Sequence, residues 1–143
     1  MKLEGRILLF DMVNINNDIF PKTCKIDIPE KIPLTWDFQH DKVIGFANVI
    51  KDERGLIAKA ETFSNEFIGV KDIKDILTNG KIGAGGFYNK VKKHNEGKLI
   101  IIDEAALREV ALVLKPVREE YLFKIVEDEE RSSYQTKIKK KLK

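Results

Sequence analysis

The feature that most restricts the fold of this chain is an alternating apolar stretch over residues 43–63. Two runs, 43–50 and 56–63, flank the turn KDERG, in which Gly55 can adopt a positive φ. This pattern predicts an antiparallel hairpin. Strands are also predicted for RILLF near the start and for a second hairpin, FYNKVKK and KLIIIDE, around HNEG.

Helical spacing replaces the alternation over 65–78, where Ser64 is a plausible N-cap and Asn79-Gly80 supplies the stop. We also expect a turn of helix in ALRE, then a buried strand closed by Pro116, and a second helix after this proline. The expected fold is mainly β with α, a small β-barrel flanked by helices. The predicted core comprises Ile44, Phe46, Val49, Leu56, Ile73, Leu77, Ile101, Val110 and Leu112.

The chain length of 143 residues predicts one domain, 1–126, followed by a charged tail, 127–143. The net charge is +3, and the last seven residues, KIKKKLK, carry five lysines, so the rest has a charge of −2 (+3 minus +5). The body is therefore not a basic nucleic-acid module. Nucleic acid is an unlikely partner except for weak, salt-sensitive binding through the tail.

Other classes of site and location are disfavoured. No apolar run approaches the roughly 20 residues that span a bilayer, and the run at 7–10 is too short for a secretory signal. The single Cys24 excludes an internal disulfide, which suits a reducing cytoplasm, and is expected to be a small structural residue. Two histidines and one cysteine have no ligand spacing, so we expect no metal and no other cofactor.

A glycine cluster, KIGAGGFYNK at 81–90, holds three glycines in six positions. Such density predicts a sharp bend or a close backbone approach. The cluster is either a plain tight turn between a helix and a strand or a turn that exposes backbone N–H groups. It is a poor phosphate loop, because no Gly-Lys-Ser/Thr ending follows.

Two titratable residues lie near apolar runs. His40 follows IPLTWDFQ and precedes Asp41, where a histidine is either a base or an ordinary surface or structural residue. Glu109 precedes a buried-looking run, where an acid either orients a histidine or is simply solvated. Each signal is weak alone, and it is the order of the three stretches along the chain that makes them informative.

In that order the stretches resemble the prohead maturation proteases of tailed bacteriophages, a group related to the herpesvirus assemblins. The matching motifs are His-Asp followed by Ile-Gly (40–45), a Gly-Leu that opens a second strand (55–56), a Ser-small-Gly-Phe turn (84–87), an acid-Val-Ser-Leu-Val segment (109–113) that ends in Pro116, and the early NDIFP (17–21). The resemblance covers about residues 5 to 117.

The resemblance implies a serine endopeptidase that cleaves scaffold and capsid proteins during phage head assembly. His40 would be the general base and Glu109 the acid that orients it, with Asp41 as the runner-up acid. Ala84 stands at the position of the nucleophilic serine, and the N–H groups of Gly85 and Gly86 would form the oxyanion hole.

Two positions depart from the family pattern, since Ala84 and Ala111 replace serines. A methyl group cannot attack a peptide bond, and loss of a triad nucleophile lowers kcat by roughly a millionfold. The chain is therefore expected to be inactive as a peptidase. Two explanations fit: an engineered change in a self-cleaving protease, or a natural scaffold- or capsid-binding pseudoprotease.

The same resemblance implies a partner and a place. The expected partners are the phage scaffold and the major capsid protein, inside a procapsid in the host cytoplasm. Self-association is left open, because the herpesvirus enzymes are dimers. The sharpest expectation is geometric: the methyl of Ala84 should face the ring of His40 within a few ångströms, and the carboxylate of Glu109 should reach the other ring nitrogen.

Overall fold

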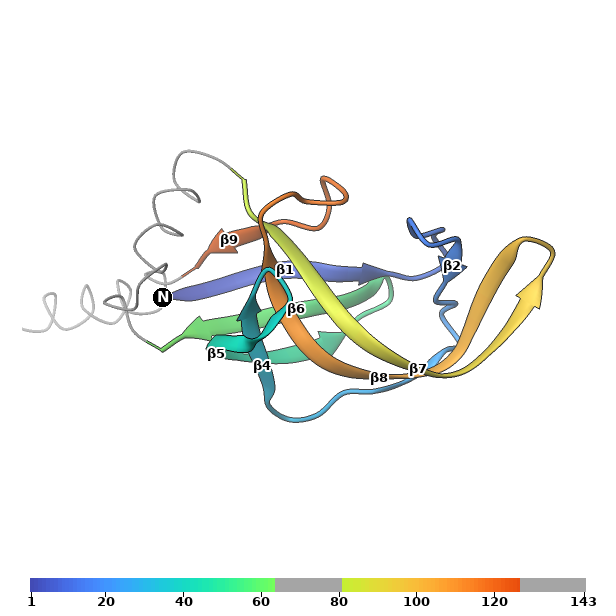
Figure 1. Ribbon diagram of the computed structural model, residues 1–143, viewed down its shortest axis with the longest axis horizontal. Helices are drawn as coiled ribbons and strands as arrows, with labels where there is room; N and C mark the ends of the chain where they lie inside the picture. The colour runs from blue at the N-terminus through green and yellow to red at the C-terminus, as the bar shows by residue number, and fades with distance from the viewer. Residues whose placement is uncertain (64–80, 127–143) are drawn as a thin grey trace, which may run out of the picture.

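The computed structural model describes residues 1–63 and 81–126, which form one curled, mixed sheet of nine strands (Figure 1). Its hydrogen-bonded path runs β2-β8-β4-β5-β6-β1-β9, and β3 and β7 also pair with β8. The strands are β1 (Lys2–Leu9), β2 (Asp18–Ile19), β3 (Lys25–Asp27), β4 (Ile32–Trp36), β5 (Gln39–Lys51), β6 (Gly55–Thr62), β7 (Gly83–Glu96), β8 (Leu99–Val113) and β9 (Phe123–Ile125).

The predicted hairpin is confirmed as β5 and β6, which pair antiparallel from Gly45–Thr62 to Lys51–Leu56. In its turn, the Asp52 carboxylate accepts hydrogen bonds from the N–H groups of Arg54 and Gly55, both at 2.9 Å. A Cβ on Gly55 would lie 1.9 Å from the backbone oxygen of Leu8. This glycine is therefore required because β1 packs directly against the start of β6.

The second predicted hairpin is also confirmed, and it is longer than the sequence pattern indicated. β7 and β8 pair from Gly83–Val113 to Glu96–Leu99. The other edge of β8 carries three short parallel partners, β2, β3 and β4. β8 is thus the central strand of this half of the sheet, and its pairing with β7 continues as a two-stranded arm (Figure 1).

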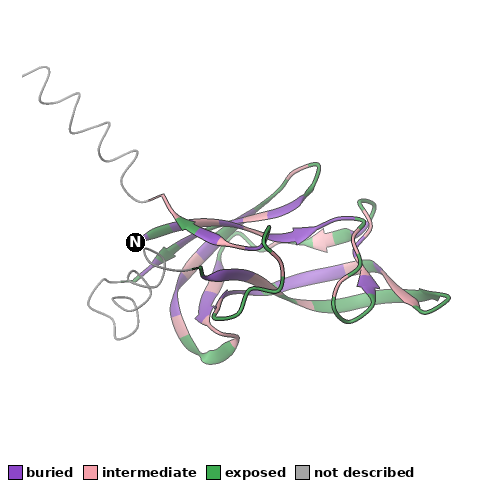
Figure 2. Ribbon diagram, turned by 90° about the horizontal axis from the view of Figure 1, so that it is seen from above, coloured by how far each residue is buried: buried purple, intermediate pink, exposed green. Residues whose placement is uncertain are grey.

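The core lies inside the curl of the sheet, where the buried residues gather on the strands, whereas the tip of the arm is exposed (Figure 2). Five residues of the predicted core are buried: Ile44, Val49, Leu56, Val110 and Leu112. Phe46 and Ile101 are half-buried, and Ile73 and Leu77 lie outside the described residues.

The expected fold flanked by helices is wrong, because residues 1–63 and 81–126 contain strands and no helix. The ALRE segment belongs to the continuous strand β8. After Pro116 the chain makes a turn and then forms β9, which pairs with the edge of β1. Tyr121 and Phe123 are buried around the less buried Leu122, a period of two that follows from this pairing.

The predicted helix over 65–78 and the tail at 127–143 lie outside the described residues. Over the two described ranges, no helix has the length and apolar character needed to cross a membrane.

Candidate functional site

The glycine cluster is not a turn but the first part of the extended strand β7. Its residues pair in sequence with β8, from Gly83–Val113 to Phe87–Glu109. Successive side chains of a strand point to opposite faces of the sheet. Residues 83, 85 and 87 therefore share one face, here called the His40 face, and residues 84, 86 and 88 share the other, called the groove face.

On the His40 face the structure brings His40 and Glu109 together. The Nδ1 atom of His40 lies 2.6 Å from Oε2 of Glu109. The Glu109 side chain is 5% exposed, whereas that of His40 is 68% exposed. The ring of Phe87 packs edge-on against the imidazole, with 5.3 Å between centroids. A buried acid thus holds an exposed ring, whose Nε2 atom has no hydrogen-bond partner among residues 1–63 and 81–126 and can act on a neighbouring molecule.

A tight turn delivers His40 to this position. Asp37 and Phe38 have φ values of 50° and 59°, between the paired residues Trp36 and Gln39. Aspartate tolerates this left-handed conformation, but a bulky phenylalanine rarely adopts it. The N–H of Asp37 donates to the carbonyl oxygen of Leu112 at 2.7 Å, which ties the turn to β8. The surrounding structure therefore holds a strained turn beside the histidine.

Gly85 makes room for that turn. A Cβ at this position would lie 2.7 Å from Cζ of Phe38 and 3.1 Å from Cγ2 of Val113. The absence of a side chain lets the Phe38 ring lie directly on β7. On this face the glycine therefore serves packing between β7 and the His40 turn.

Two buried oxygen atoms of the His40 face have no hydrogen-bond partner within the described ranges: Oε1 of Glu109 and Oγ1 of Thr35. Thr35 pairs with Ala111, which lies two residues beyond Glu109 on β8, so both side chains point to the same face. Buried polar atoms in native proteins are almost always satisfied. We therefore expect an ordered water or a polar ligand atom beside these two oxygen atoms.

Ala84 lies on the groove face, away from His40. It is 4% exposed and pairs with the core residue Leu112. A Cβ on Gly5 of β1 would lie 3.1 Å from the Ala84 methyl, so the methyl points to the junction of β1 and β7. Of the three predicted catalytic positions, the structure brings two together and leaves the third behind the sheet.

The two expected oxyanion donors are also separated. The N–H of Ala84 donates to the carbonyl oxygen of Tyr121 at 2.8 Å, so it points away from β8. In an extended strand consecutive N–H groups point to opposite edges. The N–H of Gly85 therefore points toward β8, and that of Gly86 points toward the open edge. Two neighbouring donors of this strand cannot converge on one oxyanion.

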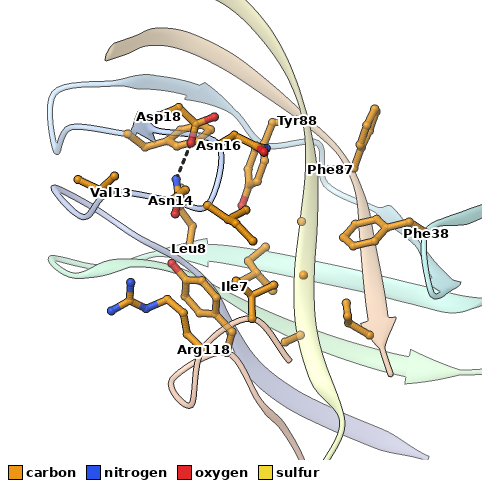
Figure 3. Close-up of a pocket in the computed structure, with 18 of the residues that line it drawn as sticks. Ile7, Leu8, Val13, Asn14, Asn16, Asp18, Phe38, Phe87, Tyr88 and Arg118 are labelled. Carbon is orange, nitrogen blue, oxygen red and sulfur yellow. Dashed lines mark hydrogen bonds between the residues drawn. The ribbon is translucent and has the colours of Figure 1, made fainter. Parts of the chain in front are cut away.

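A groove of about 550 Å³ lies beside β7, and it is lined by Ala84 and Tyr88 of the groove face and also by Gly85 and Phe87 of the His40 face. Figure 3 shows Ile7, Leu8 and Tyr88 on one side of β7 and Phe38 and Phe87 on the other. The hydroxyl of Tyr88 is buried and has no hydrogen-bond partner among the described residues. Burial raises the pKa of this phenol far above its usual value, so it stays protonated. Sequence reasoning read Tyr88 as an ordinary strand residue.

Other titratable residues are explained by structure alone. Burial and the nearby Asp103 raise the pKa of Cys24 to about 11, which keeps its thiol protonated. A hydrogen bond from His94 to Asp103, at 2.6 Å, raises the pKa of this exposed histidine. Within the described ranges, no three His, Cys, Asp or Glu side chains gather in a way that would hold a metal ion.

No protein-family model matches this chain, and no curated protein matches its sequence. The resemblance to prohead proteases therefore rests on the short motifs given above. The geometry of the two faces of β7 must carry the functional argument.

Proposed function

We propose that this chain is a non-cleaving relative of the prohead proteases that binds a scaffold or capsid protein during phage head assembly. The observation that carries the proposal is the separation across β7: the His40–Glu109 pair lies on one face, and the Ala84 methyl lies on the other. Such a pair without a facing nucleophile cannot perform acyl transfer.

Among the described residues, neither Thr35 nor Cys24 can replace the missing serine as a nucleophile. Thr35 carries a hydroxyl on the His40 face, but its oxygen is buried and a peptide carbonyl cannot reach it. The Cys24 thiol is buried as well, and its raised pKa of about 11 leaves almost no thiolate at neutral pH. The accessible features are an exposed imidazole edge and an apolar groove, which suit binding.

A second candidate is a prohead endopeptidase disabled by an alanine in place of its serine. The 2.6 Å contact between His40 and Glu109 favours this candidate, because a base held by a buried acid is what the chemistry requires. The two candidates differ in one respect: the disabled enzyme should regain cleavage when a hydroxyl is restored.

Ala84→Ser, with Ala111→Ser as its matched comparison, separates the candidates. Ala111 pairs with Gly85 and therefore lies on the His40 face, whereas Ala84 lies on the groove face. Each variant is incubated with the phage scaffold and capsid proteins, and products are identified by mass spectrometry. We expect neither variant to cleave these proteins or its own tail. Cleavage by Ala84→Ser that disappears in Ala84→Ser/His40→Ala would contradict the proposal and establish a disabled peptidase.

The binding part of the proposal has its own test. The chain is co-expressed with the phage capsid and scaffold proteins, and assembled particles are sedimented. We expect the chain to sediment with the particles and to stay at the top of the gradient when expressed alone. If it never enters particles, the partner assignment fails.

A further inference from the structure

We propose that the groove on β7 binds an extended polypeptide segment that adds a strand to the open edge of β7 and presents an acidic side chain to Arg118. This deepens the proposed function, on which it rests for the identity of the partner. Four features of the described residues indicate such a site.

The first feature is an unpaired strand edge. β7 pairs with β8 along one edge, and on its other edge Gly83 forms a single bridge with Leu122. Within the described ranges, no strand pairs with this second edge from Gly85 onward. The N–H of Gly86 points to this edge by the alternation set by Ala84. An exposed edge of this kind is a template for strand addition.

The second feature is the buried hydroxyl of Tyr88, which lies against Gly86 on the groove face. A Cβ on Gly86 would lie 2.6 Å from the Tyr88 oxygen. The hydroxyl has no partner in the described part of the chain and lines the groove (Figure 3). An unmade hydrogen bond of a buried group is costly. A peptide carbonyl or amide in the groove would satisfy this hydroxyl.

The third feature is a set of exposed apolar side chains around the groove. Val13, Ile15, Phe87 and Val117 line it and are 45% to 81% exposed. A contiguous apolar patch on a soluble protein usually marks an interaction site. Apolar residues at alternate positions of an added strand would cover these side chains.

The fourth feature is charge, which decides the chemistry of the occupant. Two charged groups of the groove, Asp18 and Lys90, form an ion pair at 2.5 Å and so neutralise each other. Arg118 also lines the groove, and within the described ranges its carboxylate contact is Glu120 at 3.5 Å on the surface. The groove therefore carries one weakly compensated positive charge. An acidic residue on the occupant complements it.

These features together favour a peptide over other occupants. A small apolar molecule would leave the Gly86 N–H and the Tyr88 hydroxyl unpaired. A second copy of this chain would make binding depend on self-association. An extended acidic and apolar segment satisfies the edge, the hydroxyl, the apolar rim and Arg118 at once.

The test selects a library of random octapeptides on the full-length chain and measures the affinity of enriched peptides by fluorescence anisotropy. We expect apolar residues at alternate positions and at least one acidic residue. Tyr88→Phe should weaken binding about fivefold, and Arg118→Glu about tenfold. Arg108→Glu is the matched control, because this exposed arginine does not line the groove, and its affinity should match that of the unmodified chain.

Backbone pairing is tested with the same peptides, N-methylated at one residue at a time. Methylation of alternate residues should abolish binding, because their N–H groups would face β7. The inference is overturned if no peptide is enriched, if all four proteins bind equally, or if sedimentation shows that a second copy of the chain occupies the site. Peptides that bind while scaffold and capsid proteins do not would refute the proposed partner and leave the groove assignment intact.

Discussion

The two faces of β7 are built for different tasks from residues that alternate along six positions of sequence. On the His40 face, the Phe38 ring lies against Gly85 and the imidazole packs against Phe87, which is 45% exposed at the rim of the groove. On the groove face, Ala84 is packed in the core, while the Tyr88 hydroxyl lies in a groove that is open along the strand edge. An extended strand thus places residues that are adjacent in sequence on opposite faces, and Gly85 and Phe87 reach the rim of the groove from the His40 face.

This difference explains why the glycine-cluster motif, which implied a single catalytic turn, instead leaves the expected catalytic residues on two opposite faces of a strand. In a sharp turn, the side chain and the following N–H groups can converge on one point. In a paired strand the side chain and the following N–H groups diverge. Residues 83–86 form such a strand, because each of them pairs with β8.

The largest expected effect is on the His40 face. His40→Ala leaves the buried Glu109 carboxylate without a partner, and such uncompensated charges destabilise proteins by about 3 kcal/mol or more. Because His40 is mostly exposed, water enters and we expect about 2 kcal/mol, measured by urea unfolding. Adding Glu109→Leu should recover most of this loss, because it removes the buried charge.

His94→Ala is the control for that measurement. This histidine also contacts an acid, Asp103, but both side chains are exposed, so the loss of stability should be much smaller than that of His40→Ala. If the single variant His40→Ala and the double variant were equally unstable, Glu109 would not be a buried charge in need of its partner.

The next effect separates two neighbouring glycines. Gly85→Ala should destabilise the fold by about 1.5 kcal/mol, because its methyl would meet the Phe38 ring in a strained turn. Gly86→Ala should cost a similar amount, because its methyl would meet the hydroxyl and two ring carbons of Tyr88 at 2.6 to 3.0 Å and the whole ring would have to move. Peptide binding should separate the two variants: Gly86→Ala displaces the Tyr88 ring and should abolish binding, whereas Gly85→Ala moves only Phe38 at the rim of the groove and should weaken binding less. Equal effects of the two variants on peptide binding would remove the distinction between the faces.

The sequence predicted the parts of this molecule that local patterns determine. The hairpins of β5–β6 and β7–β8 follow from alternation and turn residues, and both are confirmed. The helix expected after Pro116 is wrong over the described residues 117–126, because the free edge of β1, which is remote in sequence, pairs with Phe123–Ile125. Tertiary pairing of this kind overrides local propensity.

The candidate site, too, could be predicted from the sequence only in part. No local signal links His40 to Glu109, which are 69 positions apart, and their expected pairing came from motif order. The separation of Ala84 from them depends on whether residues 83–86 form a turn or a strand, and glycines fit either. The roles of Phe38 and Tyr88 depend on side-chain packing that follows only from the folded sheet.

A smaller effect concerns the groove face alone. Tyr88→Phe removes a buried hydroxyl that has no partner in the described part of the chain, so we expect a gain in stability of about 1 kcal/mol by thermal unfolding. The same variant should bind peptide more weakly. Gain of stability with loss of binding would indicate that the hydroxyl is kept for a ligand. A loss of stability instead would mean that the hydroxyl already has a partner, such as an ordered water.

The smallest effect concerns an ion pair between β1 and the turn of the β5–β6 hairpin, which does not line the groove. Arg6, which follows Gly5 on β1, donates two hydrogen bonds to the Asp52 carboxylate, at 2.7 and 2.8 Å. These bonds hold the pKa of Asp52 well below its usual value. A carboxyl whose pKa is lowered by folding stabilises the protein above its unfolded pKa, roughly 3.9, and loses this contribution as the pH falls toward the folded pKa.

Asp52→Asn should therefore cost no more than about 0.5 kcal/mol at pH 7, because the pair is partly exposed and screened by solvent. The difference between the two proteins should shrink as the pH is lowered from 5 to 2, in unfolding experiments at fixed ionic strength. The imidazole NMR signals of His40 should be the same in both proteins, since its face does not contact this pair. A shift of those signals would show that the two faces of β7 are coupled and would break the comparison on which the separate sites depend.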